Sequence, residues 1–110
     1  MGNVITKFTF RSFFTSDLQT NPFGSFKSGE TVQITFANDT SFPHAIHLHG
    51  HHFYEVDGNG SLGDLRDTTL VNAGASRDII CVFDNSGRWL LHCHMLSHAT
   101  GGMRTWVNVA

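Results

Sequence analysis

The chain has 110 residues, a formal net charge of −2 and 15% charged residues, which suits a single domain, residues 1–110, with a core of modest size. The weak negative charge argues against a nucleic-acid partner, and the sequence contains neither an apolar run long enough to cross a membrane nor a signal peptide. Eleven glycines, ten phenylalanines and frequent Thr and Val favour an all-β domain over a helical one.

The first part of the chain contains two segments typical of β-strands, residues 4–10 and 31–36. Residues 12–27 between them carry turn signals and are expected to be irregular, and residues 28–30 are expected to form a tight turn. Apolar side chains alternate with polar ones along both strands. The residues expected to face inward are Phe8, Phe10, Val32, Ile34 and Phe36.

The first histidine-rich segment is Pro43-His44-Ala45-Ile46-His47-Leu48-His49-Gly50-His51. Successive side chains of a strand point to opposite faces of the sheet. The apolar members mark the inner face, so the alternation places His44 inward with Ile46 and Leu48. The outward residues are then His47 and His49.

The middle of the chain is expected to hold three further strands, residues 53–56, 68–71 and 77–83. Residues 57–64 read as a solvated hairpin loop. Their acidic spacing faintly resembles a calcium-binding loop, but Leu62 stands where that loop needs glycine, and no glutamate closes it.

The second histidine-rich segment begins with a strand at residues 87–93, and residues 95–100 are expected to form a short helical turn. The same alternation places Trp89, Leu91 and Cys93 inward and Leu90, His92 and His94 outward. A closing strand is expected at residues 104–109. Seven or eight strands without a long helix predict an all-β, Greek-key β-sandwich or barrel.

The inward residues predict a metal site. A Cys with two His in a trigonal set and a weak axial Met is the blue-copper arrangement. The chain offers such a set in His44, Cys93, His98 and Met103. Zinc also binds Cys and His, but structural zinc usually takes more thiolates or a closed tetrahedral set, and Met103 favours copper.

Four other residues near these segments remain to be interpreted. A disulfide between Cys81 and Cys93 is the alternative to ligation by Cys93, whereas Cys81 alone reads as a buried, inert thiol. His51 could orient a ligand, and His52 reads as a surface residue. Asp67 could tune a ligand or simply end a strand.

The two histidine segments resemble the copper-binding signatures of the last cupredoxin domain of multicopper oxidases. The family pattern H-x-x-H-x-H-G-H is similar to residues 44–51, and H-C-H-x3-H-x4-[M/L] is similar to residues 92–103. Arg66-Asp67-Thr68 and Gly87-Arg88-Trp89 also resemble that domain. The resemblance covers residues 28–109 and implies a cupredoxin-type fold.

By this resemblance, His44, Cys93, His98 and Met103 would hold a type 1 copper that takes electrons from a small reducing substrate such as a phenol, a mediator or Cu(I). A trinuclear copper cluster would reduce O2 to water. Its ligands in this chain would be His47, His49, His92 and His94. Because His92 and His94 flank Cys93, one residue of backbone joins the two sites, and these three residues would carry the electron path. The family resemblance also favours a periplasmic or secreted location.

Four histidines are half of a trinuclear set, and the chain has no further H-x-H pair. A homo-oligomer containing two-fold pairs would supply the other half, since a two-fold axis brings the same face of two copies together. A second cupredoxin domain or a partner chain would supply it equally. The alternative function is a one-copper electron-transfer or copper-binding module without oxidase activity. A copper nitrite reductase fits the paired histidines around Cys93 less well.

Overall fold

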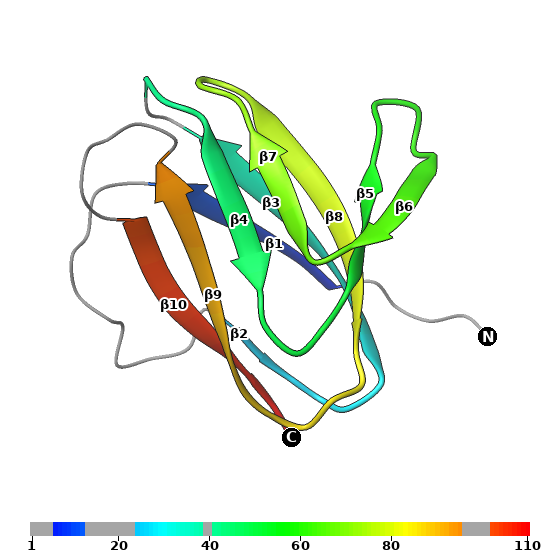
Figure 1. Ribbon diagram of the computed structural model, residues 1–110. Helices are drawn as coiled ribbons and strands as arrows, with labels where there is room; N and C mark the ends of the chain where they lie inside the picture. Colours follow the sequence, from blue (N-terminus) through cyan, green and yellow to red (C-terminus); the bar gives the residue numbers. More distant parts are fainter. Residues whose placement is uncertain (1–5, 13–23, 39–40, 96–101) are drawn as a thin grey trace.

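The computed structural model describes residues 6–12, 24–38, 41–95 and 102–110, with side chains for 24–38, 41–92 and 106–110. Within these residues the chain forms ten strands in two five-stranded sheets, and the sheets lie face to face (Figure 1). No helix in the described part of the chain is long and apolar enough to cross a membrane.

The first sheet has the strand order β1-β3-β8-β5-β6. Its strands are β1 (Thr6–Ser12), β3 (Glu30–Asn38), β8 (Ser76–Phe83), β5 (Phe53–Val56) and β6 (Leu62–Arg66). β1 pairs with β3 in parallel, and the other neighbours are antiparallel. The second sheet has the order β2-β10-β9-β4-β7. Its strands are β2 (Gly24–Phe26), β10 (Gly102–Val109), β9 (Gly87–Met95), β4 (His44–Leu48) and β7 (Thr68–Val71).

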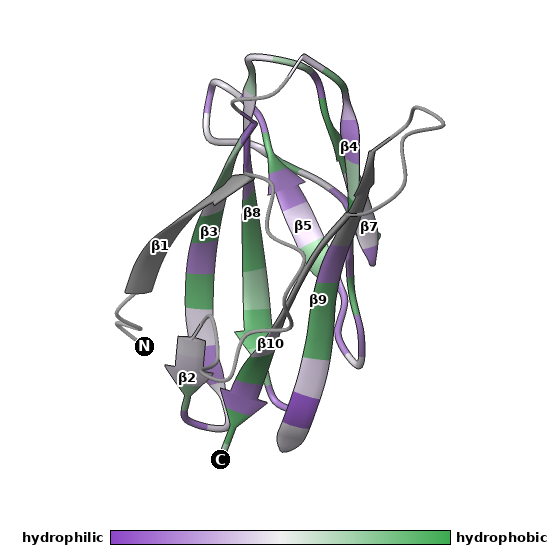
Figure 2. Cartoon of the chain, turned by 90° about the vertical axis from the view of Figure 1, so that its left-hand side faces the viewer, coloured by the Kyte–Doolittle hydropathy of each residue, from purple (hydrophilic) through white to green (hydrophobic). Residues whose placement is uncertain are grey.

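The core lies between the two sheets and is built from the inward side of each alternating strand. In β3, Val32, Ile34 and Phe36 are at most 1% exposed, as expected from the sequence, and Figure 2 shows this strand alternating between hydrophilic and hydrophobic residues. The rings of Phe26 and Phe83 stack across the core with centroids 4.5 Å apart. Full burial of side chains of this size contributes about 1.5–3 kcal/mol each, so the core is what holds β4 and β9 in place.

The all-β sandwich predicted from the sequence is confirmed, but the strand count differs because two short strands were not foreseen. β2 lies inside the range expected to be irregular, and three residues are too few to show a period. β6 begins inside the expected 57–64 loop. Every residue of β6 is exposed at the edge of its sheet, so no burial pattern marks this strand in the sequence. Met95 ends β9 rather than starting a helical turn, and residues 96–100 lie outside the described part.

Candidate metal centre

β4 and β9 run side by side in the second sheet and bring the two histidine segments together (Figure 1). They are antiparallel, and the register places His47 directly opposite His92. Ile46 and Leu48, which flank His47 along β4, are each 2% exposed, as the alternation predicted. The core packing of these neighbours therefore directs His47 to the outer face of the sheet.

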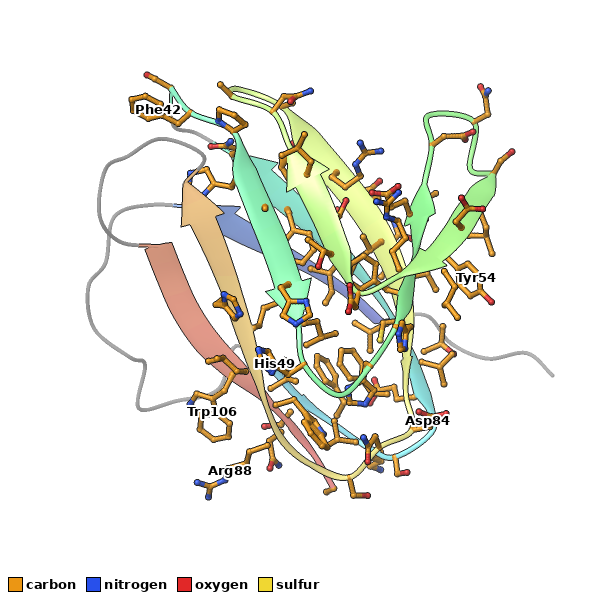
Figure 3. The ribbon with its side chains drawn as sticks, viewed as in Figure 1. Phe42, His49, Tyr54, Asp84, Arg88 and Trp106 are labelled. Carbon is orange, nitrogen blue, oxygen red and sulfur yellow. The ribbon has the colours of Figure 1, made fainter. Side chains whose placement is uncertain are left out.

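Three imidazole rings meet on this outer face: those of His47, His49 and His92. One ring nitrogen from each lies within 4.8 Å of the others, a spacing that could hold a metal ion. The ring centroids are 4.7 Å apart for His47 and His49, 5.4 Å for His47 and His92, and 5.3 Å for His49 and His92. His49, labelled in Figure 3, is exposed, and the other two rings are partly buried, so a ligand can reach the cluster through His49. We call these three residues the histidine triad.

The ring of His47 is held so that one nitrogen remains for a metal. Its Nδ1 lies 2.9 Å from the carbonyl oxygen of Asp67 and 3.0 Å from Oγ1 of Thr68. A carbonyl oxygen only accepts, so Nδ1 carries the hydrogen and donates it, which leaves the lone pair on Nε2. Metal-binding histidines commonly donate the other ring N–H in this way.

Asp67 acts through its backbone at this site. The same carbonyl oxygen also accepts the N–H of Leu48, at 3.1 Å, and the Asp67 carboxylate lies farther from His47 Nδ1, at 3.9 Å. Asp67 thus lies between the end of β6 at Arg66 and the start of β7, and its carbonyl oxygen orients the His47 ring; the role of His47 as a ligand stays a prediction. Sequence reasoning did not single out Thr68 as a partner of His47, and the pattern Arg66-Asp67-Thr68 was the available signal.

The other four residues expected around a single copper are described only in part. His44 is 2% exposed and lies on the core side of β4, as predicted. The backbone of Cys93 is paired with Ile46 on one side and Met103 on the other, so β4, β9 and β10 bring these positions together. The Cys93 and Met103 side chains and the whole of His98 lie outside the described part. His94 pairs with Ala45, two positions along β9 from His92.

Burial gives His44 a pH dependence that can be measured on the metal-free chain. Desolvation lowers the pKa of its imidazole below the ordinary value of 6.5. The unfolded chain therefore takes up this proton first, and His44 destabilises the fold as pH falls below about 6.5. We expect urea unfolding to show a loss of stability between about pH 7.5 and about pH 5.5, and a smaller loss in His44→Gln. An equal pH dependence in the two proteins would contradict this account.

Cys81 is a free, buried thiol, so the alternative of a disulfide between it and Cys93 is wrong. Its Sγ donates to the carbonyl oxygen of His52 at 3.5 Å. Burial, with a smaller contribution from Asp84, raises the pKa of the Cys81 thiol to about 12. A thiol of this kind neither reacts readily nor binds metal at neutral pH, as expected.

Comparison with known proteins places these features in one family. A family model described as multicopper oxidase matches residues 4–110. The multicopper oxidase MmcO of Mycobacterium tuberculosis is 38% identical over 86 residues, covering 78% of this chain and 17% of the relative. Copper resistance protein A of Escherichia coli is 41% identical over 83 residues, covering 76% of this chain and 14% of the relative.

A solved structure of the same fold is also similar in sequence. The crystal structure of Lac15 from a marine microbial metagenome is 55% identical and superposes with a TM-score of 0.84, covering 94% of this chain and 26% of the Lac15 chain. The chain therefore spans about a quarter of that structure and less than a fifth of the two curated relatives. These likenesses support the cupredoxin-type fold and copper as the cofactor.

Proposed function

This chain belongs to the multicopper oxidase family, and from that premise we propose that it oxidises small one-electron donors at a type 1 copper and contributes to the reduction of O2 to water at a trinuclear copper cluster. The proposed type 1 ligands are His44, Cys93, His98 and Met103. The proposed trinuclear ligands are His47, His49, His92 and His94. The donors are phenols, mediators or Cu(I), and the family resemblance favours a periplasmic or secreted location.

The observation that carries the proposal is the convergence of the histidine triad. Three ring nitrogens within 4.8 Å of one another, from two neighbouring strands and the loop after one of them, form a donor set suited to copper. The Nδ1–H of His47 is already donated to Asp67, so the free Nε2 fits a metal without any change of tautomer. The donor set on this face therefore fits the cofactor of the family.

When bound, copper supplies the one-electron redox chemistry. The chain holds and separates the ligands. β9 carries His92, Cys93 and His94 in succession, so the two proposed sites are joined through one residue of backbone. The core packing of Ile46 and Leu48 keeps His44 and His47 on opposite faces of the same short strand. A one-residue shift in the register of β4 would exchange the faces that His44 and His47 occupy, and the two proposed ligand sets would no longer be separate.

We further propose that the remaining trinuclear ligands come from another protein surface facing the triad. A second copy related by a two-fold axis would bring an identical set, because two-fold interfaces are self-complementary. A second cupredoxin domain or a partner chain would bring the same chemistry, and the small share of each relative that this chain covers supports that route equally.

The molecular mass in solution, measured together with copper per chain, tests the proposal. An oligomer with more than one copper per chain, a near-ultraviolet shoulder from coupled coppers and oxygen consumption with a phenolic donor would support the self-complementary route. The same properties appearing only after addition of a second cupredoxin domain would support the partner route. A blue monomer with one copper and no oxidase activity in either case would favour the electron-transfer module and overturn the oxidase.

A further inference from the structure

His49 is the one member of the histidine triad that no strand holds. β4 ends at Leu48, and the register between β4 and β9 ends there too. Two hydrogen bonds fix the backbone of His49 instead. Its N–H donates to the carbonyl oxygen of Leu90 in β9 at 2.9 Å, and its own carbonyl oxygen accepts from Nδ1 of His51 at 3.4 Å. The backbone of His49 is therefore in contact with both β9 and His51.

His51 is fixed from both sides of its ring. It is 5% exposed, and its ring centroid lies 4.9 Å from that of Phe83 and 5.8 Å from that of Trp89. Its Nε2 accepts the backbone N–H of Asn85 at 3.3 Å. A backbone N–H only donates and a carbonyl only accepts, so the ring is neutral with its hydrogen on Nδ1. Both nitrogens are engaged by the protein, and neither is left for a metal.

Asn85 lies in the turn between β8 and β9 and contacts the loop after β4, which contains His49 and His51. Its side-chain Nδ2 donates to the carbonyl oxygen of Gly50 at 3.1 Å, and its backbone carbonyl oxygen accepts the Nε1–H of Trp89 at 2.8 Å. Trp89 stands on β9, the strand that carries His92. The contacts of Asn85 and His51 therefore tie the loop after β4 to the strand that bears another member of the triad.

We propose that His51 and Asn85 are positioning residues that hold His49 at its distance from His47 and His92. Their contacts run from the turn before β9, through the buried His51 ring, to the carbonyl oxygen of His49. The inference rests on the proposed role of His49 as a copper ligand. It adds that two residues outside the ligand set determine how well the triad binds a metal.

The tautomer of His51 tests the inference without any metal. Above neutral pH, proton–nitrogen correlation spectra of the metal-free chain should place the His51 ring proton on Nδ1. A proton on Nε2 would overturn the proposal, because that ring could not accept from Asn85 and donate to His49 as described. This measurement stands even if the triad binds no copper, so failure of the proposed function would be recognised separately.

Two variants of His51 separate positioning from packing. His51→Phe keeps the ring against Phe83 and Trp89 but loses both hydrogen bonds. His51→Asn loses the ring but keeps a donor nitrogen two bonds beyond Cβ, where Nδ1 stands, and so can still donate to His49. We expect His51→Phe to shift and broaden the His49 ring signals and to weaken Cu2+ binding about 10- to 100-fold, whereas His51→Asn retains most of the affinity despite lower stability. The reverse order, with the phenylalanine variant closer to wild type in both measurements, would overturn the proposal.

Asn85→Ala and His52→Ala complete the experiment. Asn85→Ala removes the side-chain hydrogen bond to Gly50 and keeps the backbone contacts of Asn85 with His51 and Trp89, so it tests the Asn85 side chain alone, and its His49 signals should also shift. His52 is exposed and directly follows His51 in the chain. His52→Ala should leave the His49 signals and Cu2+ binding unchanged. An equal response in these two variants would count against a specific role for Asn85.

Discussion

Alanine in place of His47 is expected to abolish oxygen reduction while leaving the blue absorption of the proposed type 1 copper intact. His47 would supply one of the ligands of the trinuclear cluster, and its neighbours Ile46 and Leu48 keep β4 anchored in the core whatever the residue between them. Loss of only a hydrogen-bond partner of a ligand typically costs about 10- to 100-fold, so loss of a ligand itself should lower activity by more than about a hundredfold. Oxygen uptake with a phenolic donor and the visible spectrum measure the two effects.

Two further variants test the two proposed copper sites separately. Cys93→Ser should remove the blue absorption together with activity, since it deletes the proposed thiolate ligand, and His94→Ala should behave as His47→Ala does. His52→Ala removes an exposed histidine outside the triad and serves as the matched control, with both properties retained. Wild-type oxygen uptake in His47→Ala would contradict the role of the triad in oxygen reduction.

Gly50→Ala is expected to have the largest effect on stability of any single methyl addition near the metal centre. Gly50 has φ +77°, and a Cβ there would lie 2.4 Å from the ring of Trp89. The left-handed backbone costs a non-glycine residue about 1–2 kcal/mol, and overpacking against the partly buried ring of Trp89 adds about 1–3 kcal/mol. A total near 3 kcal/mol should lower the melting temperature by roughly 10 °C or more in a domain of this size. Thermal unfolding of the metal-free chain measures it.

Gly74→Ala is the matched control for this substitution. Gly74 has a similar φ of +71°, but nothing lies within 4 Å of the position that its Cβ would take. Only the backbone cost of about 1–2 kcal/mol should remain. The difference between the two variants then reports the contact of Gly50 with Trp89. Equal losses of stability would mean that the indole ring moves aside without cost.

The strands that the sequence predicted best are those with one buried face. β5 and β7 have the predicted bounds, and β3 shows the predicted inward residues, because alternation records which side of a strand meets the core. The edge strand β6 was missed because no residue in it is buried. The inward positions expected for Phe8 and Phe10 lie outside the described side chains and stay predictions.

The candidate site could be predicted as two ligand sets, but the sequence did not show how the ligands are held. Spacing within residues 44–51 and 92–103 separated inward from outward histidines, and the burial of His44 and the partial exposure of His47 agree with that division. Asn85 carried no recognisable signal, since its role depends on contacts with residues more than 30 positions earlier in the chain.

By itself the sequence determined which side chains of β3 and β4 face the core, because this follows from residue type and from the two-residue period of a strand; the ligand roles stay predictions. Only the tertiary structure decided that His47 stands opposite His92, that Asp67 holds the His47 hydrogen on Nδ1, and that Asn85 contacts the ring of His51. These features depend on sheet register and loop packing between segments 20 to 45 positions apart, where no local pattern carries information.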